Sequence, residues 1–72
     1  MDYNQVRDHF RLTRVESEIA VRVAAGQSPK QIARETHRSV ETVRNQLKIV
    51  FQKTETHSQL QLAVKILRGD SR

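Results

Sequence analysis

The chain has 72 residues and a mass of 8.4 kDa, which is enough for one small domain and excludes large catalytic scaffolds. It has no cysteine, no apolar run long enough to span a membrane and a polar N-terminus, so we expect a cytoplasmic protein with no disulfides and no membrane partner. Thirteen Lys and Arg against eight Asp and Glu give a net charge of +5, which favours an acidic partner.

The spacing of apolar residues predicts an all-α fold. Glycine is scarce and no segment alternates like a strand, while apolar residues recur at three- and four-residue steps. We divide the chain into an N-terminal arm or short helix (1–11), a helical domain (12–68) and a C-terminal tail (69–72). In the first segment Val6 and Phe10 are four residues apart, which fits either a short packed helix or a frayed arm.

The first helix of the domain is predicted to begin after Thr13 and to end at Gly26. Thr13 and Glu16 have the spacing of a capping box, and glycine suits the left-handed position that follows a helix. The expected apolar face consists of Val15, Ile19 and Val23. The expected polar side, facing solvent or the helix N-terminus, consists of Glu16, Ser17, Glu18 and Arg22. Pairing of Glu16 or Glu18 with an arginine such as Arg38 is a further expectation.

Two more helices are predicted in close succession, separated by three or four residues. Ser28, Pro29 and Gln31 form a helix-start signal for a short helix over about 29–36. Ser39 then caps a longer helix over about 40–53. The apolar side of this longer helix comprises Val40, Val43, Leu47, Val50 and Phe51, and its opposite side comprises Glu41, Arg44, Asn45, Lys48 and Gln52.

The last predicted helix, over about 58–67, has two apolar stripes. One stripe is Leu60, Ala63, Val64 and Leu67, and the other is Leu62 and Ile66. A chain of this size has core enough to cover only one stripe, so we expect the other to mediate self-association. Our candidates for the dimer interface are Leu60, Val64 and Leu67, although which stripe forms it stays open and all of these residues could be plain core.

A short helix, a tight turn and a longer helix that exposes Arg, Asn and Lys form the pattern of a helix-turn-helix that reads DNA. Arg44 and Lys48 can donate to guanine, and Asn45 can pair with adenine in a bidentate contact. The charge is also uneven: residues 37–72 carry seven basic and three acidic groups, against six and five in residues 1–36. Exposed helices often carry such residues for solubility alone. The prediction therefore depends on finding them together with the short preceding helix and the basic charge.

Three segments of the chain together resemble a known family. The matching positions are Leu12, Thr13, Glu16, Glu18 and Ile19, then Ala25, Gly26, Ser28, Lys30, Ile32 and Ala33, then Ser39, Thr42, Val43, Arg44, Asn45, Leu47, Phe51 and Lys53. In order and spacing they are similar to the LuxR/GerE-type DNA-binding domain of bacterial transcription regulators, over roughly residues 12–67. The resemblance implies a four-helix domain whose third helix enters the major groove of double-stranded DNA and whose fourth helix can mediate dimerisation.

The resemblance also implies roles for single residues. Arg44, Asn45 and Lys48 fall where family members touch bases, and Lys30 and Thr42 fall where they touch phosphate. Arg38, an extra cation in the turn, is our third candidate for a phosphate contact. The family usually has apolar residues at the positions of Thr36 and Arg38. It usually has Pro, Gly and Arg at the positions of Arg14, Glu55 and Gln59.

The leading hypothesis is a homodimeric transcription regulator that binds a two-half-site operator. An alternative is an interaction module, or anti-activator, that pairs through its last helix with a larger LuxR-type regulator. A third possibility is a fragment similar to the promoter-contacting fourth region of a sigma factor, against which the distinct apolar last helix argues. If the chain is complete, regulation must come from its abundance or from a partner.

No catalytic or metal-binding arrangement is evident. His9, His37 and His57 are far apart and lack cysteine companions, so we expect no metal site. The sequence contains no Ser-His-Asp arrangement, paired-carboxylate cleft or glycine-rich phosphate loop. We therefore expect neither an enzyme nor a cofactor.

Overall fold

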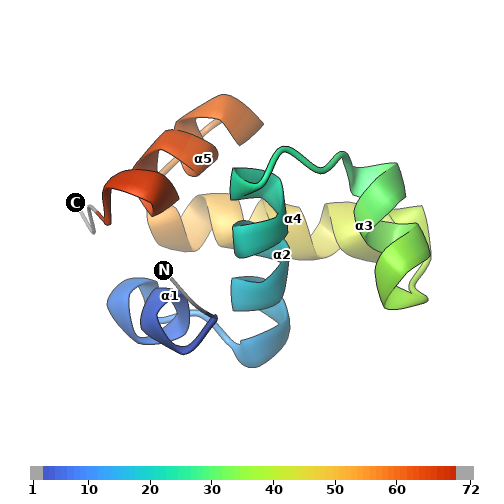
Figure 1. Ribbon diagram of the computed structural model, residues 1–72, viewed down its shortest axis with the longest axis horizontal. Helices are drawn as coiled ribbons and strands as arrows, with labels where there is room; N and C mark the ends of the chain where they lie inside the picture. Colours follow the sequence, from blue (N-terminus) through green and yellow to red (C-terminus); the bar gives the residue numbers. More distant parts are fainter. Residues whose placement is uncertain (1–2, 70–72) are drawn as a thin grey trace.

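The computed structural model describes residues 3–69, which form five helices and no strand (Figure 1). In chain order they are α1 (Tyr3–Phe10), α2 (Arg14–Ala24), α3 (Pro29–Thr36), α4 (Val40–Thr54) and α5 (Gln59–Arg68). The last four are the helices predicted from the sequence, and the all-α prediction is confirmed. Residues 70–72 of the predicted tail lie outside the described residues.

Side chains at the helix starts form the predicted caps. Thr13 Oγ1 accepts a hydrogen bond from the Glu16 N–H at 3.2 Å, and Glu16 Oε1 accepts from the Thr13 N–H at 2.9 Å. Ser28 and Gln31 form the same reciprocal pair at the start of α3, where Pro29 is the first helical residue. Ser39 Oγ accepts from the backbone of α4. Each cap satisfies an N–H group that the helix cannot pair internally.

Left-handed residues end the helices. Gly26 follows α2 with φ +90°, as the sequence predicted. His37 and Glu55 follow α3 and α4 with φ 56° each, although a side chain makes this conformation unfavourable. The chain direction therefore changes within a few residues after each of these helices.

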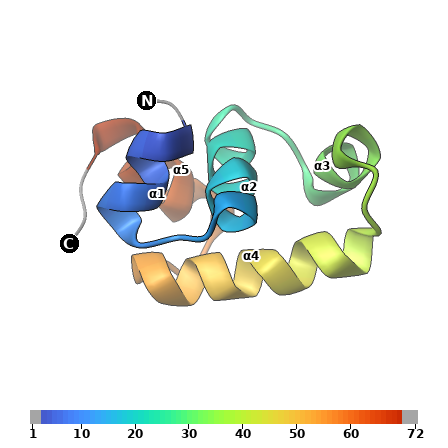
Figure 2. The same ribbon diagram turned by 90° about the horizontal axis from the view of Figure 1, so that it is seen from below.

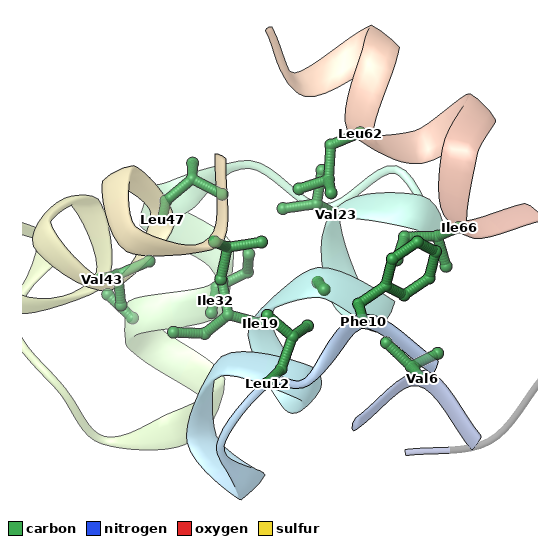
Figure 3. Packing of buried hydrophobic residues seen from close by; sticks show 13 residues of the cluster. Val6, Phe10, Leu12, Ile19, Val23, Ile32, Val43, Leu47, Leu62 and Ile66 are labelled. Atoms are coloured by element: carbon green, nitrogen blue, oxygen red, sulfur yellow. The ribbon is translucent and has the colours of Figure 1, made fainter. Parts of the chain in front are cut away.

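The hydrophobic core lies where α2 crosses the middle of α4 (Figure 2). Next to this crossing, α3 lies beside the N-terminal end of α4, while α1 and α5 lie beside its C-terminal end. Every helix contributes buried apolar side chains, and Figure 3 shows those of the core facing one another. The fully buried ones include Val6, Ile19, Ile32, Val43, Val50 and Leu62.

The short helix α1 is packed rather than frayed. Val6 is fully buried and Phe10 is 5% exposed, and both belong to the common core. Of the two alternatives left open for the N-terminal segment, the short packed helix is therefore correct for residues 3–10. The domain boundaries drawn from the sequence stay predictions.

On α2, Glu16 and Ser17 were expected to face solvent or the helix N-terminus. Glu16 caps the helix start as predicted, but neither residue faces solvent. Both are buried, and their polar atoms have partners: Ser17 Oγ donates to the Arg14 carbonyl at 2.7 Å, and Glu16 accepts from Lys53 of α4 at 2.8 Å. Hydrogen bonds to such partners offset the desolvation penalty of burying a polar group. The pattern of apolar spacing alone could not reveal these local and long-range partners.

Candidate nucleic-acid interface

Helices α3 and α4 are joined by a turn of three residues, 37–39, as predicted. The turn begins at left-handed His37, and the Arg38 N–H donates to the Ala33 carbonyl at 3.0 Å, which closes the end of α3. Ile32 of α3 and Val43 of α4 are both fully buried. Their burial packs the short helix against the start of the long one.

Helix α4 is amphipathic, with one side in the core and the other in solvent. Val43, Leu47 and Val50 are buried, as predicted. The three candidate base contacts, Arg44, Asn45 and Lys48, are all exposed. None of these three side chains forms an ion pair or hydrogen bond with another described residue. They are therefore free to donate hydrogen bonds to an external partner.

Two of the candidate phosphate contacts lie in the first turns of the two helices. Lys30 is exposed in the first turn of α3, and Thr42 is exposed in the first turn of α4. Ser39 Oγ donates to Thr42 Oγ1 at 2.8 Å and accepts from the Thr42 N–H at 3.0 Å. The Thr42 hydroxyl proton is left for another acceptor. The partial positive charge at helix N-termini favours anions at both places.

Arg38, the third candidate phosphate contact, is oriented toward α2. Its Nη1 atom lies 3.6 Å from Glu18 Oε1, and its side chain is 26% exposed. Pairing of Glu18 with Arg38 was one of the pairings expected from the sequence. This guanidinium therefore already has a counter-charge inside the protein.

On the opposite side of α4, Lys53, which is partly exposed, forms an ion pair with buried Glu16 that was not predicted from the sequence. Lys53 Nζ lies 2.8 Å from Glu16 Oε1, whose side chain is only 6% exposed. Burial raises the pKa of Glu16, but the Lys53 hydrogen bond and charge and the hydrogen bonds with Thr13 outweigh it and hold the pKa below its ordinary value. The two residues are 37 positions apart, so no local pattern could have paired them.

One stripe of α5 is buried and the other is exposed. Leu62 and Ile66 belong to the core, whereas Leu60, Val64 and Leu67 are 75%, 42% and 72% exposed. Leu60 and Val64 also line an open groove of about 420 Å³ together with Lys65 and Arg68. The predicted interface residues thus form an apolar face that no described residue covers.

The described residues contain no group of three potential metal ligands, and His9, His37 and His57 are exposed. Within residues 3–69 no helix is both long and apolar enough to cross a membrane. The geometry therefore points to the exposed side of α4 and the apolar side of α5 as the surfaces available for partners.

Comparison with known proteins gives one match. The family model described as bacterial regulatory proteins, luxR family, matches residues 11–66. No curated protein and no solved structure matches the chain. The family match covers most of the chain and includes the whole of α2, α3 and α4. The chain belongs to the LuxR family of bacterial regulatory proteins and carries its helix-turn-helix DNA-binding domain.

Proposed function

We propose that the chain is a sequence-specific, cytoplasmic transcription regulator that inserts α4 into the major groove of double-stranded DNA. The observation that carries this proposal is the exposure of three polar side chains, Arg44, Asn45 and Lys48, that pair with no other described residue and lie on a helix whose other side is buried. Arg and Lys donate to guanine O6 and N7, and Asn forms a bidentate contact with adenine. No catalytic step and no cofactor form part of the proposal.

Contacts to phosphate would fix the position of α4 on the duplex. Lys30 supplies a charge from the first turn of α3, and Thr42 supplies a hydroxyl donor from the first turn of α4. Such contacts orient a protein on DNA without selecting a sequence. Because Arg38 is paired with Glu18, we assign it a smaller part in phosphate binding than the sequence implied.

The exposed apolar face of α5 supports a homodimer that binds two half-sites. Burying one large apolar side chain contributes roughly 1.5–3 kcal/mol, and this face leaves Leu60, Val64 and Leu67 in water. An isologous contact between two copies of α5 would place the two α4 helices about 34 Å apart, which is one turn of DNA. Such a dimer would act at a promoter by recruitment or by occlusion.

The same face supports the second candidate function, pairing with a larger LuxR-type regulator in a heterodimer. The two functions differ in the state of the isolated chain. Sedimentation of the chain at high micromolar concentration without DNA distinguishes them, because a homodimer is preformed there. A clean monomer would contradict the preformed homodimer and favour the heterodimer.

In vitro selection of DNA sites by the purified chain tests the proposed function. We expect enrichment of one half-site sequence, and enrichment of a palindrome if two copies bind together. The Arg44→Ala variant, run in parallel, should relax the preference at one position of the half-site. Selection that enriches no sequence would contradict the proposal.

A further inference from the structure

Five partly exposed side chains form a connected polar group, here called the α2–α3 network: Glu18, Arg22, Gln27, Glu35 and Arg38. Arg22 Nη1 lies 2.8 Å from Glu35 Oε1 and 3.3 Å from Gln27 Oε1. Gln27 Nε2 donates to the same Glu35 oxygen at 3.1 Å. Glu18 Oε1 lies 3.5 Å from Arg22 Nε and 3.6 Å from Arg38 Nη1. The Glu18 carboxylate thus faces the guanidinium groups of both Arg22 and Arg38.

The network spans the part of the fold where α2 and α3 meet. Helix α3 packs mainly on α4, whereas α2 packs on α5 and α1 as well as on α4, and the two helices touch one another little. Helix α2 lies across the middle of α4, and α3 lies beside its N-terminal end (Figure 2). Arg38 belongs to the turn and directly precedes Ser39, the residue that caps α4. Its ion pair with Glu18 therefore connects α2 to the point where α4 begins.

Arg38 depends on Glu18 more than the other members do. Arg38 Nη1 and Arg22 Nε are buried and have no hydrogen-bond partner among residues 3–69. Arg22 keeps a second carboxylate, Glu35, whereas Glu18 is the only carboxylate within 4.0 Å of Arg38 in residues 3–69. Loss of the Glu18 charge would leave a partly buried guanidinium without a counter-charge, which is costly.

We propose that Glu18 is a positioning residue for DNA binding: by holding Arg38 it fixes the turn 37–39 and the first turn of α4 without itself touching DNA. This inference rests on the proposed function of α4. Arg44 and Asn45 follow within two turns of the anchored end, so movement of the turn displaces both of them.

Whether removing the Glu18 charge weakens or strengthens DNA binding distinguishes this positioning role from a purely electrostatic effect. Removal of a carboxylate from a DNA-binding protein strengthens its attraction to phosphates. Removal of a carboxylate that anchors the helix-turn-helix weakens binding instead. A Glu18 variant therefore gives opposite results under the two accounts.

The test compares Glu18→Gln with Asp8→Asn, which removes the same charge from an exposed side chain of α1. The double variant Glu18→Gln with Arg38→Met removes both partners of the ion pair. Two quantities are measured for each protein: the affinity for a duplex obtained by selection, and the backbone hydrogen exchange of residues 38–42 without DNA. Exchange in α1 and α5 shows whether the fold is intact.

We expect Glu18→Gln to bind the duplex about 2- to 5-fold more weakly and to exchange faster at residues 38–42 only. Asp8→Asn should bind equally well or more tightly, and the double variant, which lacks the same ion pair, should bind no more tightly than Glu18→Gln. Binding of Glu18→Gln as tight as that of Asp8→Asn, or unchanged exchange at residues 38–42, would overturn the inference. If the unmodified chain binds no duplex, the proposed function fails, and the exchange measurement alone decides whether Glu18 anchors the turn.

Discussion

Glu16 connects the start of α2 to the C-terminal half of α4. Its carboxylate accepts from the Thr13 N–H as part of the capping box and from Lys53 Nζ of α4. One buried residue therefore orders a helix start and holds α4 against the rest of the domain. Its two partners keep the carboxylate charged despite its burial.

The stabilising effect of Glu16 should depend on pH. Because its pKa in the folded chain lies below the ordinary value of 4.5, the charged form stabilises the fold above that pH. The stabilisation is lost as the pH falls through the lower, folded-state pKa. Glu16→Gln should lower the free energy of unfolding by about 1–3 kcal/mol at pH 7, and by progressively less below pH 4.5. Urea unfolding at several pH values measures this, and a difference that stays constant down to pH 3 contradicts it.

The exposed side of α4 predicts distinct effects of base and phosphate contacts. Replacing Arg44 with Ala should cost about 1–3 kcal/mol of binding free energy at one base position and relax the preference there. Replacing Lys30 with Ala should weaken binding to all duplexes about equally. Affinities for a panel of single-base variants of the site measure both. If the two changes weakened every duplex by the same factor, the proposed division between base and phosphate contacts would be wrong.

Among single residues, the sequence predicts what is local and misses what is distant. Thr13 and Glu16 are three residues apart, so their capping box follows from helix geometry. The pairing of Glu16 with Lys53 depends on how α2 crosses α4, which no periodicity records. Exposure of Arg44 and Lys48 was predictable because the buried positions Val43 and Leu47 set the orientation of α4.

At the level of elements, the end of α4 carries a strained residue. Glu55 has φ 56° and ψ 45°, a conformation that costs a residue with a side chain roughly 1 kcal/mol. Glu55→Gly should therefore raise the free energy of unfolding by about 0.5–1 kcal/mol, with part of the gain offset by the greater freedom of glycine in the unfolded chain. Glu55→Ala is the control, since it removes the charge but keeps the strain. Equal urea midpoints for the two variants would contradict a backbone origin.

The exposed side of α5 predicts how the chain assembles. Leu60→Glu places a charge on an apolar side chain that is 75% exposed, so the monomer should still fold while the homodimer is lost. Sedimentation should show a monomer, and binding to a palindromic site should be much weaker. Asn4→Glu adds the same charge to an exposed position of α1 and should leave the dimer intact. A dimer that survives Leu60→Glu would exclude this face as its interface.

For α4 and α5, the sequence differs in how well it predicts which side of the helix is buried. One apolar side on α4 left no choice about which residues enter the core. On α5 either of two apolar stripes could enter the core. Only the packing against α2 shows that Leu62 and Ile66 are the buried pair. For α1, the spacing of Val6 and Phe10 allowed a helix, but its stability depends on burial in the common core, which is a tertiary property.

For the molecule as a whole, the arrangement leaves two surfaces for partners. The three-residue turn and the crossing of α2 over α4 expose the polar side of α4, while the burial of Leu62 and Ile66 turns the other side of α5 outward. The net charge of +5, concentrated in residues 37–72, attracts a polyanion toward the half of the chain that contains α4. Together these properties support the proposed DNA-binding surface on α4 and the proposed protein-binding surface on α5.

The most direct test of this account is a titration of the selected duplex and of a shuffled duplex of the same composition over a series of salt concentrations. We predict tighter binding to the selected duplex. We also predict a slope of log affinity against log salt concentration of about −4 to −7, corresponding to about four to eight phosphates contacted by a dimer. Equal affinity for the two duplexes, or affinity that does not change with salt, would contradict sequence-specific DNA binding by this chain.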